Sequence, residues 1–270
     1  MTIETPPEKR MRLRYAGQCR LCGTELPARA EAIWERVTKT VRCVECREST
    51  AAAEVDAGVP GASARREYER RRAMDEQRVR DRHPRTARLR LALGGERRST
   101  KSWDTGAIGE EQFGARLQEM ANERLRVLHD RRVPGKRSNI DHIAISPSGV
   151  WILDPKRYRD QQPVLRVEGG FRRPRVEKLM VGGRNQTRLV DGMLGQLELV
   201  REIVGPEIPV RGVLCFIEAR WPLFGGDFSI DGVGVMWPRR LYPQLSQEGP
   251  LGVDDIDRLY RALGTALPPA

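Results

Sequence analysis

Three residues in the second half of the chain, Asp141, Asp154 and Lys156, are of the types that support hydrolysis of phosphodiester bonds. Two carboxylates held close together repel each other unless a cation lies between them. A bound Mg²⁺ would polarise a phosphate and lower the pKa of a bound water, and the lysine would orient that water or stabilise transition-state charge. The alternative is an exposed hairpin end with ordinary surface charges, because a D…DxK pattern alone is a weak signal.

A β-hairpin is the element that would bring these residues together. The β-rich runs IDHIAIS and GVWILD flank a Pro-Ser-Gly turn. If Ser146 pairs with Gly149, then Asp141 lies opposite Asp154, and directly opposed Cβ atoms are about 5 Å apart. Lys156 lies two residues beyond Asp154 and therefore shares its face of the strand. The sequence thus predicts one Mg²⁺ site at the end of the hairpin.

Two amphipathic segments flank the hairpin and could add to this site. The segment TGAIGEEQFGARLQEMANERLRVLHD predicts a helix that begins near Thr105, with Glu110 near its start, where it could face the sheet edge and join the metal shell. The candidate core residues of this segment are Ile108, Phe113, Leu117, Met120 and Leu128. Downstream, NQTRLVDGMLGQLELVREIV predicts a second helix with Gln186 at its start. Two roles fit Gln186 equally, contact with the site or the phosphate backbone, and the N-terminal cap of the helix.

Four of the five cysteines lie near the N-terminus and form two C-x2-C pairs. Cys19 and Cys22 form the first pair, and Cys43 and Cys46 form the second. This spacing is typical of a structural zinc site, in which four thiolates surround the ion, and redox-active cysteines are the alternative. Such a ribbon binds either nucleic acid or a protein partner, and the spacing does not choose between them. Cys215, in the run VLCFIEA, is predicted to be a buried strand residue.

Composition divides the chain into three parts: a zinc ribbon at residues 1–50, a linker and Arg-rich helix at 51–100, and an α/β domain at 101–270. The chain has 48 basic and 37 acidic residues, and the first hundred residues hold 23 and 15 of these. A basic arm of this kind favours a polyanion such as DNA or RNA, although a solvated helix has the same composition. Ser63 is the expected N-cap of that helix, and Pro84 is expected to break it.

The segments GAIGEEQFGARL, NIDHIAISPSGVWILDPKRY and GRNQTRLV together resemble the nuclease-related domain (NERD) family of the PD-(D/E)XK restriction-endonuclease-like superfamily. The resemblance covers roughly residues 103–220 and implies an α/β fold with a mixed sheet flanked by helices. It also implies nucleic-acid cleavage that depends on Mg²⁺ or Mn²⁺. Asp141 and Asp154 would bind the metal, Glu110 would act through water, Lys156 would act on the nucleophile, and Gln186 matches on the following helix.

Two features depart from the pattern or extend it. Asp154 stands where the family commonly has Glu, and Pro155 removes a hydrogen-bond donor, so the strand is expected to end or to lie unpaired there. The loop after the site is rich in arginine and could contact phosphate, although a solvated hairpin would look alike. Its arginines are Arg157, Arg159, Arg172, Arg173 and Arg175.

Taken together, these patterns predict a cytoplasmic, metal-dependent endonuclease that acts on nucleic acid, with DNA as the first expectation. A membrane partner is not expected, because no run of about 18 apolar residues and no apolar leader occurs. Two alternatives remain open: a nucleic-acid-binding protein that does not cleave, and a regulatory module in which the ribbon recruits a protein partner. The complete set of Asp141, Asp154 and Lys156 argues for catalysis, since binding alone needs no paired acids.

Overall fold

The computed structural model describes residues 8–19, 24–35, 40–44, 55–93, 98–136, 138–170, 173–223 and 226–270. The chain forms two compact units, Met1–Glu54 and Val55–Ala270. The predicted boundaries at residues 50 and 100 differ from this division, because the Arg-rich helix lies in the second unit. Residues 55–61 are also attached to that unit: the His129 amide donates to the Ala57 carbonyl at 2.7 Å, and the Arg131 guanidinium donates to the Asp56 carbonyl at 2.7 Å.

The first unit is built from short antiparallel strands. These are β1 (Glu8–Arg12), β2 (Gly17–Gln18), β3 (Glu25–Leu26), β4 (Glu31–Glu35) and β5 (Thr40–Cys43). Strands β1, β4 and β5 form one sheet, and β2 pairs with β3 in a hairpin. Among the described residues of this unit, the buried apolar side chains are Leu13, Cys19, Leu26 and Ala32, and Arg42 is also buried. A core this small is a weak source of stability.

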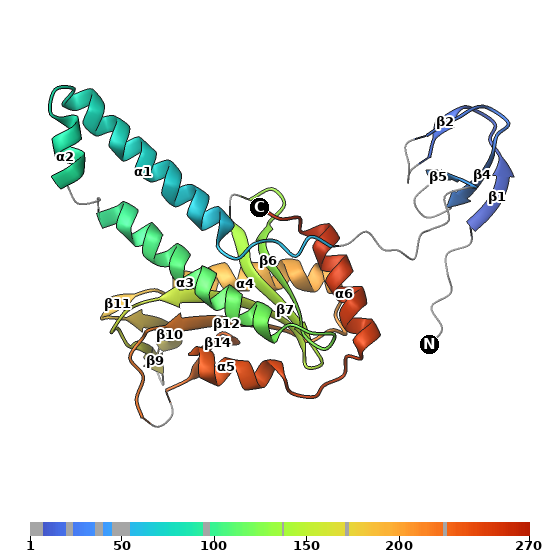
Figure 1. Cartoon of the computed structure of the whole chain (residues 1–270). Coiled ribbons are helices and arrows are strands. Elements are labelled where there is room, and N and C mark those ends of the chain that lie inside the picture. The colour runs from blue at the N-terminus through green and yellow to red at the C-terminus, as the bar shows by residue number, and fades with distance from the viewer. Residues whose placement is uncertain are drawn as a thin grey trace. The chain divides into compact units, whose positions relative to one another are not determined.

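Three helices begin the second unit. They are α1 (Ala62–Arg82), α2 (Ala87–Leu93) and α3 (Arg98–Met120). In Figure 1, α1 leads away from the large sheet, α2 lies at its far end, and α3 returns beside α1. The predicted break at Pro84 is confirmed, because α1 ends two residues before it, as the residue preceding a proline disfavours helix. The prediction that Ser63 caps α1 is wrong, since the N-cap is Gly61 and Ser63 lies within the helix.

The predicted helix from Thr105 is longer at its start and shorter at its end than expected. Helix α3 begins at Arg98 and ends at Met120, so Leu128 lies not on this helix but on strand β6 (Arg126–Arg132). Asn122 turns the chain between the two elements, because its side-chain oxygen accepts from the Arg124 amide at 2.7 Å. Leu128 is nevertheless fully buried, as expected of a core residue.

A six-stranded mixed sheet forms the centre of the second unit, in the order β13-β14-β12-β8-β7-β6. Its remaining strands are β7 (Asn139–Ser146), β8 (Gly149–Arg157), β12 (Val210–Ile217), β13 (Phe228–Ile230) and β14 (Val233–Met236). Strands β7 and β8 form the predicted antiparallel hairpin, whereas β12 runs parallel to β8. The prediction of an α/β fold with a mixed sheet flanked by helices is therefore confirmed.

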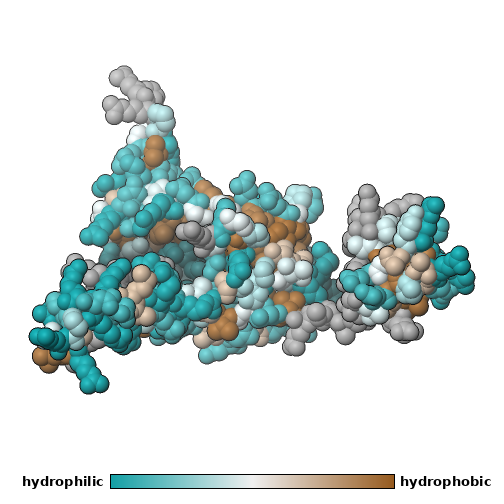
Figure 2. All heavy atoms as spheres, turned by 90° about the horizontal axis from the view of Figure 1, so that it is seen from above, coloured by the Kyte–Doolittle hydropathy of each residue, from teal (hydrophilic) through white to brown (hydrophobic). Residues whose placement is uncertain are grey.

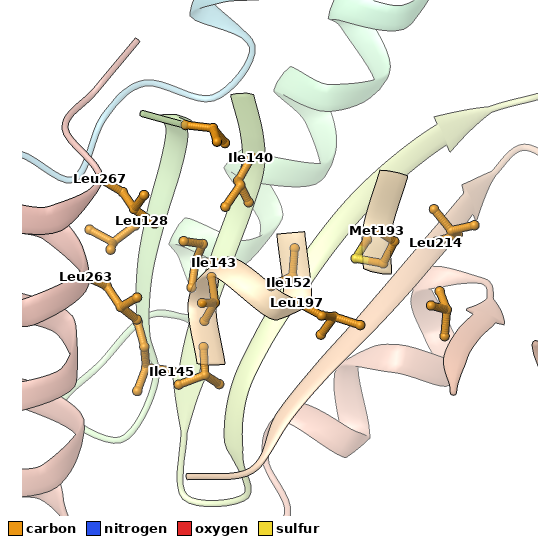
Figure 3. Close-up of a cluster of buried hydrophobic side chains, with 14 of the residues drawn as sticks. Leu128, Ile140, Ile143, Ile145, Ile152, Met193, Leu197, Leu214, Leu263 and Leu267 are labelled. Carbon is orange, nitrogen blue, oxygen red and sulfur yellow. The ribbon is translucent and has the colours of Figure 1, made fainter. Parts of the chain in front are cut away.

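Alternation along the strands gives the sheet two apolar faces. The larger cluster includes Ile143 and Ile152 of the hairpin and packs against Met193 and Leu197 of α4 (Arg188–Val204), as Figure 3 shows. Helix α6 (Val253–Ala266) also contributes to this cluster. The opposite face packs against α3 and α5 (Pro238–Leu245), and Cys215 lies there, buried in β12 as predicted.

The arginine-rich segment after the hairpin is itself a hairpin. Strands β9 (Pro163–Gly170), β10 (Arg173–Val181) and β11 (Arg184–Asn185) form a separate three-stranded sheet. On the surface drawn in Figure 2, hydrophilic residues predominate and hydrophobic residues form separate patches. None of the helices in the described part of the chain is long and apolar enough to cross a membrane.

Candidate active site

The hairpin register places the two predicted aspartates at the point where β7 and β8 separate. Strands β7 and β8 pair from Ser146 with Gly149 to His142 with Leu153, which is the predicted register. The next pair in this register would be Asp141 and Asp154, and the hydrogen-bonded pairing of the two strands ends just before it. Pro155 follows immediately and has no amide hydrogen to donate. The strand itself does not end at Pro155, because β8 continues beside β12 to Arg157.

Asp154 and Lys156 lie on the same face of the sheet, as predicted. They pair in register with Leu214 and Phe216 of β12, both of which belong to the cluster under α4. The Lys156 Nζ atom lies 2.5 Å from Asp154 Oδ1, and the two side chains are 26% and 16% exposed. The strand backbone sets both side chains on one face, and the lysine side chain loses rotamer freedom when it forms the pair.

Asp141 and Glu110 are two further carboxyls whose electrostatic interactions reach this lysine. Burial raises the pKa of Asp141 well above its usual range, and the neighbouring charges of Asp154 and Glu110 raise it further. Asp154 is also close enough to form a side-chain hydrogen bond with Asp141. Burial alone would lower the pKa of Lys156, but the Asp154 and Asp141 carboxylates outweigh burial and raise it. The carboxyls therefore outnumber the one lysine, and without a cation the raised pKa values favour protonated Asp141 and Glu110.

Glu110 approaches this group from helix α3. Burial, followed by the charges of Asp130 and Asp154, raises the pKa of Glu110 to about 7, although Lys156 and the Gly61 amide act in the opposite direction. The Gly61 amide donates a hydrogen bond to Glu110 Oε1 at 3.1 Å. Glu110 thus lies near the start of the part of α3 predicted from the sequence, and it interacts with the same lysine and aspartates.

Gln186 precedes helix α4, whose N-cap is Thr187, so the cap interpretation of Gln186 is wrong. The backbone amide of Gln186 donates to the Leu179 carbonyl at 2.8 Å, which fixes the backbone of Gln186 against β10. Its side-chain oxygen Oε1 is buried and accepts no hydrogen bond from any residue that the structure describes. A buried amide oxygen without a donor is costly and suits a cation or a water that supplies the missing contact.

The donor set of the site fits a hard divalent cation. Carboxylate and amide oxygens are the ligands that Mg²⁺ and Mn²⁺ prefer, and a cation would relieve the repulsion that raises the pKa of Asp141. Within the described ranges, no three residues of the types His, Cys, Asp and Glu lie close enough together to hold a metal ion. The arrangement therefore offers one or two carboxylates rather than a complete cage, and Mg²⁺ commonly binds in this way with waters and substrate phosphate.

Asp130 is a buried carboxylate beside the site that the sequence patterns do not indicate. It lies in β6 with a left-handed φ of 49° and is 2% exposed. Its oxygens accept hydrogen bonds from the amide and hydroxyl of Ser63, at 2.6 and 2.7 Å, and from Asn139 Nδ2 at 3.1 Å. Nothing in the sequence distinguishes Asp130 from a surface residue, because its partners come from two other elements.

Two histidines lie on the face opposite the carboxylates. His129 Nδ1 and His142 Nδ1 are 2.9 Å apart, and His129 Nε2 lies 3.2 Å from Gln118 Oε1. Burial lowers the pKa of both rings, to about 4 for His129. A Cβ atom on Gly114 would lie 2.8 Å from the His142 ring and 2.4 Å from Pro60, so the packing here is tight. The pair is therefore neutral and structural.

The arginine-rich segment after the site is partly neutralised by acidic partners. Arg157 and Arg159 both contact Glu218, at 2.9 and 3.1 Å, and Arg175 contacts Glu177 at 2.8 Å. Arg172 lies outside the described residues, as does the side chain of Arg173. The predicted phosphate-contacting role of this segment stays a prediction.

The cysteine pairs are described only in part. Cys22 and Cys46 lie outside the described residues, so the predicted zinc site stays a prediction. Cys19 follows β2, and its amide donates to the Thr24 carbonyl at 2.9 Å. The Cys43 amide donates to the Cys19 sulfur at 3.3 Å, which brings one cysteine of each C-x2-C pair together.

Comparison with known proteins gives one similarity. Residues 105–217 match the family model of the nuclease-related domain, NERD. The matched region runs from within α3 to the end of β12 and contains Glu110, Asp141, Asp154, Lys156 and Gln186. Searches of curated proteins and of solved structures give no match. The match includes all five candidate site residues, whereas residues 1–104 and 218–270 lie outside it.

Proposed function

We propose that this protein is a divalent-metal-dependent nuclease of the PD-(D/E)XK type that hydrolyses phosphodiester bonds in DNA. The observation that carries the proposal is the convergence of Asp141, Asp154 and Lys156 at the point where β7 and β8 separate. The match of residues 105–217 to the nuclease-related domain supports it independently. A structural ion pair would need only one carboxylate, whereas the charges of Asp141 and Glu110 also act on this lysine.

Each side chain has a role that follows from its place. Asp141 and Asp154 would hold Mg²⁺ or Mn²⁺, with the buried Gln186 oxygen and Glu110 acting through water. The metal, when bound, would polarise the phosphate and acidify a bound water. Lys156 keeps its proton, because the two aspartates raise its pKa, and it therefore orients the nucleophile by donating hydrogen bonds and stabilises negative charge in the transition state.

Nucleic-acid affinity would come from the end of the arm formed by α1 and α2. Residues 78–90 contain six arginines and one aspartate, whereas residues 62–77 are nearly balanced, with five arginines and four acids. In the described part of the chain, no ion pair is recorded for Arg82, Arg85 or Arg88, although ion pairs within α1 engage Arg70, Arg72 and Arg80. Guanidinium groups without acidic partners are suited to phosphate oxygens.

The first unit would be stabilised by a structural Zn²⁺ held by Cys19, Cys22, Cys43 and Cys46. Two observations support this proposal: the hydrogen bond from the Cys43 amide to the Cys19 sulfur, and the small core of the unit. Small domains with few buried residues commonly need a metal for stability. A cytoplasmic location, where thiols stay reduced, suits this site. The ribbon would add affinity for nucleic acid or recruit a protein partner.

A plasmid-cleavage assay with Mg²⁺ or Mn²⁺ tests the nuclease proposal. We expect Asp154→Ala and Lys156→Ala to lose about 100-fold or more of the activity, because each removes a group that acts at the reacting phosphate. Lys178→Ala is a matched control, because it also removes a lysine from an ion pair. The Lys178 Nζ atom lies 2.5 Å from Glu168 Oε2, and both residues belong to the separate β9–β10 sheet. Equal cutting by the wild type and all three variants would indicate a contaminant.

The same assay separates cleavage from binding. A wild-type protein that binds DNA with a steep salt dependence and never cuts it would support the non-catalytic binding function. A protein that neither binds nor cuts DNA or RNA would support the regulatory module in which the ribbon recruits a protein. Either result would refute the nuclease proposal.

A further inference from the structure

The first turn of α1 contacts the candidate catalytic carboxylate although it lies outside the region matched to the nuclease-related domain. The match begins at residue 105, and the Gly61 amide donates to Glu110 Oε1 at 3.1 Å from 49 positions earlier in the chain. A backbone N–H that donates to a carboxylate fixes the position of its oxygen and adds no mobile side chain to the site. The contact is buried, so water does not compete for it.

Glycine is required at residue 61 for this contact. Its φ of +70° lies in the left-handed region that side chains disfavour. A Cβ atom at this position would lie 2.8 Å from the Glu111 Cγ atom and 3.3 Å from the Ala107 carbonyl. The backbone of residue 61 therefore approaches α3 more closely than any other residue type would allow.

Two pairs of hydrogen bonds hold this turn against the rest of the unit. Arg65 binds Glu111 of α3 through Nε and Nη2, both at 2.9 Å. Ser63 donates its amide and hydroxyl to the buried carboxylate of Asp130. The turn is therefore fixed both to α3 and to β6.

We infer that the first turn of α1 is a positioning element of the active site, in which Gly61 orients Glu110 and Arg65 and Ser63 hold Gly61 in place. This inference rests on the proposed function. Residues 55–104 are then not a passive connector to the nuclease-like domain, because they supply a contact that the matched region lacks. Loss of the anchor would leave the fold intact and let the Glu110 carboxylate move away from the metal shell.

The test compares Arg65→Ala with Arg70→Ala in the full-length protein. Both arginines bind a glutamate through two hydrogen bonds, but the partner of Arg70 is Glu67 on the same helix. The two variants therefore remove the same charge and the same type of contact, and only Arg65→Ala removes a contact between α1 and α3. Gly61→Ala is a second variant that displaces the turn directly.

Two readouts are measured for each variant: Mn²⁺ affinity by titration calorimetry without nucleic acid, and kcat and KM for cleavage. We expect Arg65→Ala and Gly61→Ala to weaken Mn²⁺ binding and to lower kcat by about tenfold, with KM unchanged, because loss of an outer contact that orients a metal-site residue has effects of about 10- to 100-fold. Arg70→Ala should match the wild type in both readouts. Circular dichroism and thermal melting confirm that each variant is folded.

The inference is overturned if folded Arg65→Ala and Gly61→Ala bind Mn²⁺ as tightly as Arg70→Ala does. It is also overturned if all three variants lose the same affinity, since the contact with α3 would then have no special effect. A wild-type protein that binds Mn²⁺ but cuts no nucleic acid refutes the proposed function alone, because the calorimetric comparison still decides whether α1 positions Glu110.

Discussion

Replacing Glu110 with glutamine should make the metal-free protein more stable at alkaline pH. The pKa of Glu110 rises from an ordinary 4.5 to about 7, first because the side chain is buried and then because Asp130 and Asp154 are negative. The folded protein therefore binds this proton more tightly than the unfolded chain does. As a result, the free energy of unfolding falls as pH rises from about 4.5 to about 7 and is lowest above that range.

The size of the effect follows from the same pKa difference. A difference of this size corresponds to about 3 kcal/mol between acidic and alkaline pH, and the 9% exposure of Glu110 leaves little solvent screening. Glutamine has no proton to lose, yet its Oε1 atom still accepts from the Gly61 amide. Removal of the Glu110 charge also lowers the pKa of Asp141, so the substitution relieves charge repulsion at that carboxyl as well. Glu110→Gln should thus exceed the wild type by about 3 kcal/mol at pH 8 and differ little near pH 4.

Urea unfolding in EDTA, followed by tryptophan fluorescence across this pH range, measures the difference. Glu119→Gln is the control, because Glu119 lies on the same helix, is 64% exposed and pairs with Arg116. The control should show the pH dependence of the wild type. If Glu110→Gln loses as much stability as the wild type between about pH 5 and about pH 8, then the pKa of Glu110 is not raised in the folded protein.

Three further predictions concern packing, the zinc site and the basic arm. Gly114→Ala should lower the free energy of unfolding by about 1–3 kcal/mol in urea, because its Cβ would overlap neighbouring atoms. By contrast, Gly106→Ala in the same helix has nothing within 4 Å of its Cβ and should raise it by about 0.5–1 kcal/mol. A fragment of residues 1–54 should contain one Zn²⁺ by elemental analysis and should unfold on chelation, whereas a zinc-free folded fragment would refute the ribbon. Arg85→Ala and Arg88→Ala should each reduce the slope of log Kd for DNA against the logarithm of the salt concentration by about one, and Arg70→Ala should leave this slope unchanged.

The hairpin and its site residues could be predicted because they are local in sequence. A two-residue turn and two alternating strands set the register, and the register brings Asp141 and Asp154 together. Lys156 follows from the two-residue period of a strand. The amphipathic segments that flank the hairpin added Glu110 and Gln186 as candidates, and the structure connects Glu110 to the same carboxylates.

The parts that sequence reasoning missed depend on contacts between distant elements. Leu128 fits the apolar spacing of the predicted helix, but pairing with Ile143 of β7 places it in a strand. Gly61 binds Glu110 through its backbone amide, and a backbone donor leaves no mark on residue type. Ser63 is a residue type that commonly caps helices, yet its hydroxyl donates a hydrogen bond to Asp130 of β6 instead.

Pro155 explains why a sheet of ordinary apolar strands has room for charged groups at its centre. A central strand normally donates to both neighbours, so a proline there removes one hydrogen bond and favours separation from the strand it would have paired with. Strand β8 keeps its pairing with β12 through Arg157 but pairs with β7 only as far as Leu153. Asp141 and Asp154 follow the last pair directly. The proline, which cannot donate a strand hydrogen bond, is thus next to the candidate metal ligands. The loss of sheet pairing there creates the space in which two carboxylates and a lysine meet.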